Sequence, residues 1–146
     1  MRVRDFVPGD LEKICAFKEK SSEFSFPGKG VDIGIFKRQI LRSLGKKRPD
    51  SIKVVETDDG SVVAYVRFGI KKTITGEHGS IKHVFVSRDY RGQGLATMLM
   101  KEAEAGLRAL GLKDIKVVVT KTNEPSMMMC KSLGYREKRA ILEKEI

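Results

Sequence analysis

Apolar residues along the chain recur first at strand-like and then at helix-like spacing. Residues 1–6 alternate an apolar residue with charged neighbours, which predicts a short first strand. A helix is expected after it, because Asp10 can cap a helix and apolar residues from 11 to 17 follow at helical spacing. Residues 21–30 combine turn residues with two phenylalanines and show no period, so we expect an ordered loop there.

A second helix and an antiparallel hairpin are expected next. Asp32 can cap this helix, and Gly45 is placed to end it. Residues 51–56 and 62–70 are rich in β-branched side chains, and they flank Thr57-Asp58-Asp59-Gly60, whose glycine can take a positive φ. This pattern is typical of two antiparallel strands joined by a short turn.

The second half of the chain alternates strands with helices. After a polar connection over 71–79, residues 81–86 are expected to form a strand that runs directly into a long helix over 92–110. The remaining predicted elements are a strand over 115–120, a short helix that Pro125 opens and Gly134 ends, and a last strand over 135–142. The order β-α-α-β-β-β-α-β-α-β favours an α/β (α+β) fold, a mixed sheet with helices on its faces.

Composition narrows the class of protein. A length of 146 residues with 40% hydrophobic content suits one domain, 1–146. The chain lacks both a signal-peptide core and the roughly 18 consecutive apolar residues of a membrane span, so we expect a cytoplasmic location and no membrane partner. Cys15 and Cys130 lie far apart and outside any metal-ligand spacing, so neither a disulfide framework nor a metal site is expected.

The charge balance is basic, with 29 basic and 19 acidic residues and a formal charge of +10. Such a surface attracts polyanions, including nucleotide cofactors. The basic residues are scattered along the chain, and no aromatic-basic motif accompanies them. We therefore expect a solvated basic surface and no nucleic-acid site.

The segment between the strand at 81–86 and the following helix carries the strongest chemical signal. A helix N-terminus presents unpaired N–H groups, and Gly92 and Gly94 let a phosphate approach that backbone. Arg91 adds a planar cation suited to phosphate oxygens. A dinucleotide fingerprint would require glycine or alanine where Thr97 stands, and no segment matches the P-loop spacing. The residues alone predict a pyrophosphate seat, with simple helix–strand packing as the alternative.

Two blocks of sequence resemble the GNAT superfamily of acyl-CoA-dependent N-acetyltransferases. The first is Val84-Phe85-Val86 followed by Tyr90-Arg91-Gly92-Gln93-Gly94-Leu95-Ala96, an apolar strand and then the family's glycine-rich turn. The second is Asn123 followed by Lys131-Ser132-Leu133-Gly134-Tyr135. The resemblance is tight from about 81 to 135, and it implies a GNAT-like, mostly antiparallel twisted sheet flanked by helices.

The resemblance also implies a cofactor, acetyl-CoA, as co-substrate without a metal, and a primary amine as acceptor. The cofactor-binding residues that it implies are Val84, Phe85 and Val86 for the pantetheine arm, Arg91, Gly92, Gln93, Gly94, Leu95, Ala96 and Thr97 for the pyrophosphate, and Asn123 for the pantetheine side. The family splays its central strands to admit the cofactor, and a strand N–H would then face the thioester carbonyl as an oxyanion donor. Transfer would be direct, through a tetrahedral intermediate.

The catalytic acid and base depart from the family pattern. Cys130 stands where relatives commonly carry a tyrosine that protonates CoA; it is interpreted either as a small core residue or as the proton donor. Val118 and Ser80 occupy positions where some relatives place a glutamate. Glu77 is therefore the candidate base, with the alternative that it is simply solvated.

Further candidates are weaker, namely Glu23, His78 and His83. Alternation places His83 on one face with Ile81 and Phe85, which favours a packed or hydrogen-bonded histidine over a catalytic one. Two phenylalanines, Phe24 and Phe26, either line an acceptor pocket or anchor their loop to the core.

The sequence leaves several functional questions open. It does not identify the amine, and a homodimer is compatible with it without being required. The alternative function is a non-catalytic module of the same fold that binds CoA or an acidic partner, which the absent tyrosine and glutamate favour and the intact cofactor segment opposes.

Overall fold

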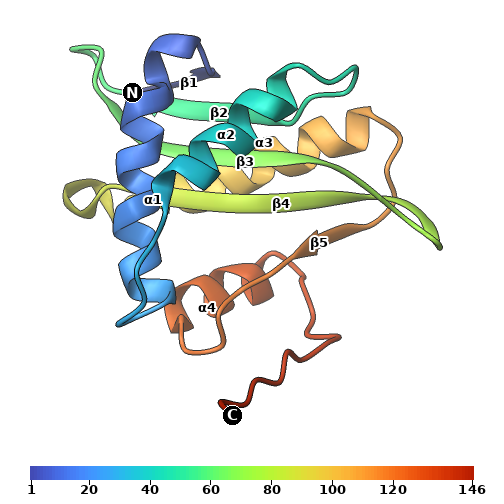
Figure 1. Ribbon diagram of the computed structural model, residues 1–146. Helices are drawn as coiled ribbons and strands as arrows, with labels where there is room; N and C mark the ends of the chain where they lie inside the picture. Colours follow the sequence, from blue (N-terminus) through green and yellow to red (C-terminus); the bar gives the residue numbers. More distant parts are fainter.

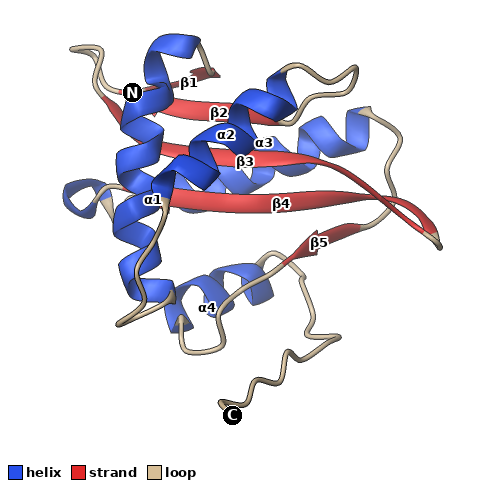
Figure 2. Cartoon of the chain, viewed as in Figure 1, coloured by secondary structure: helices blue, strands red, loops and turns tan.

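The computed structural model describes the backbone of residues 1–146 and every side chain except that of Phe24, so both roles considered for Phe24, pocket lining and anchoring to the core, lie outside the described side chains. A five-stranded sheet runs in the order β1-β2-β3-β4-β5, antiparallel throughout except for the parallel pair β4–β5. Helices cover both faces of the sheet (Figures 1 and 2). The strands are β1 (Arg2–Asp5), β2 (Ser51–Glu56), β3 (Val62–Thr73), β4 (Gly76–Val86) and β5 (Ile115–Val117). The helices are α1 (Leu11–Ser25), α2 (Ile33–Leu44), α3 (Leu95–Ala109) and α4 (Glu124–Ser132), with 3₁₀ turns η1 (Pro8–Asp10) and η2 (Arg88–Tyr90).

The predicted fold class is confirmed, and the first hairpin and the second helix form where the pattern placed them. β2 and β3 pair antiparallel across the turn at 57–60. The carboxylate of Asp32 accepts a hydrogen bond from the N–H of Gly34 at 3.0 Å, as expected of an N-cap. Asp10 does not cap α1, because its carboxylate instead accepts bonds from Arg4 at 2.8 and 3.0 Å.

Several predicted boundaries are wrong. Residues 21–25 belong to α1, where the hydroxyls of Ser21 and Ser22 donate to the carbonyl of Lys18 and so satisfy themselves inside the helix. Residues 71–79 are not a polar connection. They complete a long β3–β4 hairpin whose turn closes with Thr73 opposite Gly76. Its charged side chains hid the strand pattern because this end of the hairpin is exposed.

The last strand predicted over 135–142 does not form, and the strand predicted over 115–120 ends at Val117. The chain after α4 runs away from the sheet edge (Figure 1). Ile141 and Leu142 are 77% and 92% exposed, so this segment buries little apolar surface. A strand needs a paired neighbour to satisfy its backbone, which local propensity alone does not supply.

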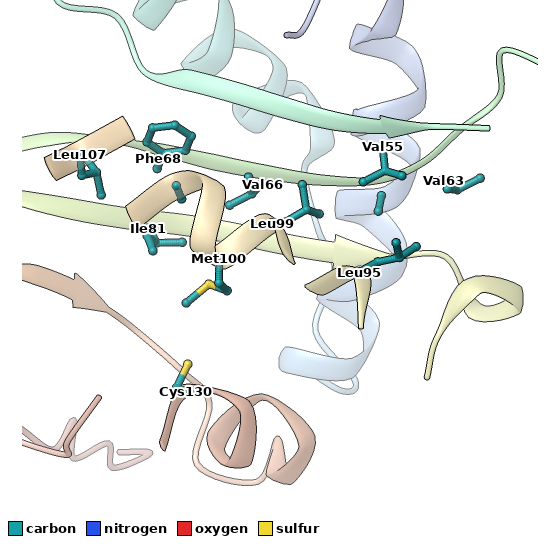
Figure 3. Close-up of a cluster of buried hydrophobic side chains, with 12 residues drawn as sticks. Val55, Val63, Val66, Phe68, Ile81, Leu95, Leu99, Met100, Leu107 and Cys130 are labelled. Carbon is teal, nitrogen blue, oxygen red and sulfur yellow. The ribbon is translucent and has the colours of Figure 1, made fainter. Parts of the chain in front are cut away.

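Two apolar clusters hold the helices to the sheet. The cluster on the face of α1 and α2 includes Phe17, which stacks on Phe85 of β4 with ring centroids 4.6 Å apart. The cluster on the opposite face joins the sheet to α3 through Leu99, Met100 and other fully buried side chains (Figure 3). Burial of such side chains is the main stabilising contribution to the fold. Among the described residues, no helix is both long and apolar enough to cross a bilayer.

Candidate active site

The strands β4 and β5 pair over a short stretch and then separate. Over the described backbone, their partners run from Gly79 opposite Ile115 to Ile81 opposite Val117, and no pair follows. The two strands diverge beyond that point (Figures 1 and 2). The segment of β4 from 82 to 86 therefore has β3 on one side and an open edge on the other, and we call this opening the split.

The hydrogen-bonding pattern decides which backbone groups face the split. The N–H of Ser87 donates to the carbonyl of Val63 at 2.8 Å, next to the pair Ala64 and Val86. Because antiparallel strands alternate bonded and non-bonded pairs, the polar groups of Val86 and Val84 point away from β3, into the split. Those of Phe85 point toward β3. Two of the three residues predicted to bind pantetheine thus present their backbone to the split.

A β-bulge lies where β4 leaves β5. Arg67 pairs with His83, whereas Phe68 pairs with Ile81, so Lys82 is the extra residue of β4. Bulges re-aim side chains and end strand pairing, and they occur frequently beside active sites. The expected alternation of His83 with Ile81 is wrong for this reason: Ile81 lies in the α3 cluster, while His83 lies on the α1 and α2 face.

The glycine-rich turn lies at the far end of the split. Gly92 and Gly94 have φ of 79° and 78°, a left-handed conformation that glycine adopts without strain. A Cβ at either position would meet nothing within 4 Å, so the approach to this backbone is open. The helix begins at Leu95, not at Gly92 as predicted, so its first N–H groups face that opening. The residues here fit a pyrophosphate.

The side chains of this segment have different environments. Arg91 is exposed, and its Nε donates to the carbonyl of Val86 at 3.0 Å. Gln93 is also exposed, whereas Ala96 and Thr97 are half-buried. Leu95 is buried in the α3 cluster, so its backbone N–H is the group that it can offer to a phosphate. The predicted pyrophosphate ligands are thus brought together around one helix end.

Asn123 and Cys130 come from α4. The side-chain oxygen of Asn123 accepts from the N–H of Ser126 at 3.3 Å and so caps this helix. Cys130 is 6% exposed and points from α4 toward Met100 of α3 (Figure 3). Burial raises the pKa of the Cys130 thiol, and Glu104 adds to the shift. A thiol in this place is protonated at neutral pH, which both the core and the proton-donor interpretations allow.

Glu77 lies at the other end of β4 from the glycine-rich turn. Both oxygens of its carboxylate accept from Nη1 of Arg48 at 3.0 Å. It stands five positions before Lys82 in the strand, roughly 17 Å along it. The structure therefore does not bring Glu77 together with the other predicted site residues. His78, beside it, is buried.

A pocket that no sequence motif indicated opens on the α1 and α2 face, beside the bulge. Its volume is about 440 Å³. We call it the basic pocket, and it is lined by Lys18, Phe36, Gln39, Arg42, Ser43, Lys46, Asp50, Arg67, Lys82 and His83. These residues come from two helices and two strands and from the turn before β2, so no local spacing could have revealed them.

Asp50 is the carboxylate of the basic pocket, and it is already paired. It accepts from Nε of Arg67 at 3.0 Å and from Nζ of Lys82 at 2.8 Å. A Cβ on the neighbouring Gly69 would lie 2.1 Å from Oδ1 of Asp50, so this close approach requires glycine. The two cations leave Asp50 no free charge with which to bind an ammonium group.

His83 is hydrogen-bonded through both ring nitrogens, as the sequence favoured. Ser21 donates to the carbonyl of Lys18 at 3.0 Å, so it accepts from Nε2 of His83 at 2.9 Å, and Nδ1 accepts from Tyr65. Burial, with the nearby cations Lys18 and Arg67, lowers the pKa of His83 to about 3. The imidazole is therefore neutral at pH 7 and has no nitrogen available as a base.

Tyr135 packs against the α3 cluster near Cys130. Its hydroxyl is buried and meets no hydrogen-bond partner among the described residues. Burial raises the pKa of Tyr135 above its usual value. The described residues form no cluster of three or more histidine, cysteine or carboxylate side chains that could hold a metal ion.

Comparison with known proteins agrees with this geometry. Residues 14–135 match the model of the acetyltransferase (GNAT) family. The chain is 28% identical over 138 residues to an acetyltransferase of Photorhabdus laumondii, covering 94% of this chain and 88% of that protein. It is 29% identical over 135 residues to the L-methionine sulfoximine/L-methionine sulfone acetyltransferase of Pseudomonas paraeruginosa, covering 91% and 78%.

Solved structures share the fold. The aminoglycoside N-acetyltransferase AAC(6')-Iy, solved in complex with CoA, superposes with a TM-score of 0.76 at 15% identity, covering 99% of this chain and 93% of that one. The family match spans most of the chain and both blocks of the predicted motif. Together with the split sheet and the glycine-opened helix, this match assigns the chain to the acetyltransferase (GNAT) family.

Proposed function

We propose that the protein transfers an acetyl group from acetyl-CoA to a primary amine by direct attack on the thioester. The observation that carries this proposal is the split between β4 and β5, with the glycine-rich turn at one end and the basic pocket at the other. An extended thioester cofactor fits such a groove because its ends need different surroundings. The pyrophosphate needs N–H donors, and the acetyl group needs access to an acceptor.

The backbone of β4 supplies the polar groups for the pantetheine arm and for the reacting carbonyl. The outward-facing N–H and carbonyl of Val84 and the N–H of Val86, whose carbonyl already accepts from Arg91, pair with the pantetheine amides in the manner of an added strand. The N–H of Val84, the first outward-facing group after the bulge, donates to the thioester oxygen as it becomes an oxyanion. A fixed N–H donor costs no reorganisation during the reaction.

The chemical step needs no covalent enzyme intermediate. The lone pair of the neutral amine forms a C–N bond to the thioester carbon, and the C–S bond breaks when the tetrahedral intermediate collapses. The CoA thiolate leaves with that electron pair, and the proton lost by the amine nitrogen passes to water or to the thiolate. Proximity and the oxyanion donor lower the barrier most, because neither His83 nor Glu77 is available as a general base. His83 is hydrogen-bonded to Ser21 and Tyr65, and Glu77 is paired with Arg48.

The known substrates of relatives support an amine acceptor. The Pseudomonas relative is named for L-methionine sulfoximine and L-methionine sulfone, and the structural neighbour for aminoglycosides. Each of these molecules carries an amino group.

The test is release of CoA thiol from acetyl-CoA in the presence of a mixed panel of small amines, amino acids and peptides, with mass spectrometry of the acetylated product. Turnover of any amine supports the proposal. Acetyl-CoA binding without turnover of any member would contradict it and favour the non-catalytic CoA-binding module instead.

A further inference from the structure

The basic pocket borders the same segment of β4 that faces the split. Lys82 and His83 line the pocket, and Val84 follows them directly. Two residue steps along a strand cover roughly 7 Å, so a molecule held in the pocket lies within reach of a thioester carbonyl at Val84. The pocket is on the α1 and α2 face, whereas α3 covers the opposite face of these strands (Figure 1). An acceptor can therefore enter without displacing the cofactor.

The charge of this pocket is one-sided. Its lining contains five cations and one carboxylate, Asp50, which Arg67 and Lys82 already neutralise. The other three cations, Lys18, Arg42 and Lys46, have no ion-pair partner among the described side chains. These cations give the pocket an excess of positive charge, to which His83, neutral at pH 7, does not add.

The buried end of the pocket is arranged to receive an anion. Nζ of Lys18 lies 5.6 Å and Cζ of Arg67 lies 5.9 Å from the centre of the Phe36 ring, so two cations share one aromatic wall. Burial, and then the charge of Arg67, lower the pKa of Lys18. An anionic ligand beside Lys18 would counteract both effects on this pKa. It would replace the solvation that the ammonium group loses on burial, and it would offset the positive charge of Arg67.

The same charges select against a polycationic acceptor. No carboxylate in the lining is available for an ammonium group, because Asp50 is occupied. Nearby cations lower the pKa of an incoming ammonium and favour the neutral amine, which is the form that attacks a thioester. The pocket therefore both holds an anionic group and helps to deprotonate the amine attached to it.

We propose that the basic pocket is the acceptor subsite and that it selects primary amines carrying an oxyanion group, such as a carboxylate or a phosphate. This inference rests on the proposed acetyl transfer and adds the class of acceptor to it. Arg42 of α2 and Lys46, in the turn after α2, are both exposed and contact the anionic group, while Lys18 and Arg67 add positive charge at the buried end of the pocket.

The test compares matched pairs of amines that differ in one charge: O-phosphoethanolamine against ethanolamine, and L-amino acids against their amides. For the anionic members we expect kcat/KM to be at least about tenfold higher at low salt, with the difference shrinking as salt screens the pocket. Arg42→Gln and Lys46→Gln should each lower kcat/KM about tenfold for the anionic members and by much less for the neutral members, which lack the charged group that these side chains contact. Arg38→Gln and Lys47→Gln are the matched controls, because both side chains are exposed on the same segment and neither lines the pocket.

A second readout separates this inference from the proposed function. Binding of the same pairs to the CoA-loaded protein is measured by calorimetry, which needs no turnover. Equal kcat/KM and equal affinity for charged and neutral members would overturn the anion inference and leave acetyl transfer standing. Binding of O-phosphoethanolamine that Arg42→Gln weakens, without turnover of any amine, would uphold the pocket and overturn the acetyltransferase proposal. Failure of every anionic member to bind, or binding that the pocket variants do not change, overturns the inference.

Discussion

Nε of Arg91 donates a hydrogen bond to the carbonyl oxygen of Val86 at 3.0 Å, which ties the start of the glycine-rich turn to the end of β4. The guanidinium lies over the Phe85 ring, with Cζ 5.9 Å from the ring centre. A single residue thus fixes the turn against the strand and keeps its other N–H groups for a phosphate. This contact holds the glycine-rich turn, which is the proposed pyrophosphate site, in a fixed position relative to β4, which is the proposed pantetheine site.

The first prediction concerns Arg91→Ala, which removes that contact and one charged phosphate ligand. Loss of a charged hydrogen bond costs about 1.5–3 kcal/mol, so the Kd for acetyl-CoA should rise roughly ten- to a hundredfold, measured by calorimetry. Lys101→Ala, exposed on α3 and outside the turn, is the control and should bind normally. Equal affinity in Arg91→Ala and the wild type would remove Arg91 from the pyrophosphate seat.

The second prediction is that acetyl-CoA raises the Tm. The split leaves the outward amides of Val84 and Val86 without a strand partner, so a ligand that pairs with them binds the folded state alone. At a concentration 100 times the Kd, linkage adds about 2.7 kcal/mol of stability, which scanning fluorimetry detects. ATP and NADH should shift the Tm much less. A shift with ATP and none with acetyl-CoA would contradict the proposed cofactor.

The sequence predicted the cofactor end of the site better than the acceptor end. Gly92 and Gly94 form a local signal, because the need for positive φ and the following helix are both encoded within a few residues. The basic pocket depends instead on a register shift at Lys82, which turns His83 onto the α1 and α2 face. The pairing of β4 with β3 decides that register, so the hydrophobic pattern of β4 alone could not predict it.

The same distinction explains the errors in the fold. The hairpin at 57–60 carries its own turn chemistry, and it was predicted correctly. The strand over 135–142 would have needed a partner at the edge of β5, which its sequence cannot specify. The distal half of the β3–β4 hairpin is exposed on both faces. Its sequence therefore lacks the alternation of apolar and polar residues from which a strand is predicted.

The third prediction concerns Cys130. Because its thiol is buried and protonated and S–H is a weak donor, Cys130→Ala should lower kcat less than about tenfold, under roughly 1.4 kcal/mol in the barrier. A small cavity beside Met100 should lower the free energy of unfolding by about 1 kcal/mol. A thousandfold loss of kcat in a folded, CoA-binding Cys130→Ala protein would instead make this thiol the general acid.

Cys130→Tyr is the companion variant, since it restores the family's usual residue. The position is 6% exposed and packed, so the larger ring should cost about 1–3 kcal/mol of stability through overpacking. If the Cys130→Tyr variant folds and binds acetyl-CoA, its kcat should match or exceed that of the wild type, because the tyrosine hydroxyl can act as the proton donor. A folded Cys130→Tyr protein with a much lower kcat would show that the acid position has not been kept in this chain.

The fourth prediction is a pH dependence of stability that comes from His83. Its pKa in the folded protein is about 3, below the ordinary value of roughly 6.5, so the unfolded chain takes up the proton first as pH falls. The stabilising contribution is complete above about pH 6.5 and is lost between there and pH 3, at up to about 1.4 kcal/mol per pH unit. Denaturant unfolding at several pH values measures it.

His83→Gln is the control for this slope. It keeps a hydrogen-bonding side chain between Ser21 and Tyr65 and removes the titrating ring. The variant should be less stable at pH 7, with a flatter dependence between pH 6.5 and 4. An unchanged slope would show that groups other than His83 cause the acid sensitivity in this pH range.

The fifth prediction concerns Tyr135, whose buried hydroxyl meets no hydrogen-bond partner in the described part of the chain. A buried polar group without a partner costs about 1–3 kcal/mol of desolvation, and Tyr135→Phe removes this cost while keeping the ring packed near Cys130. The free energy of unfolding should therefore stay the same or rise by up to about 1 kcal/mol in denaturant titrations. Tyr90→Phe, a tyrosine of η2 that packs against the same cluster, is the matched control and should show no such gain. A loss of more than about 1 kcal/mol in Tyr135→Phe would mean that the hydroxyl has a bound partner, such as an ordered water, in the folded protein.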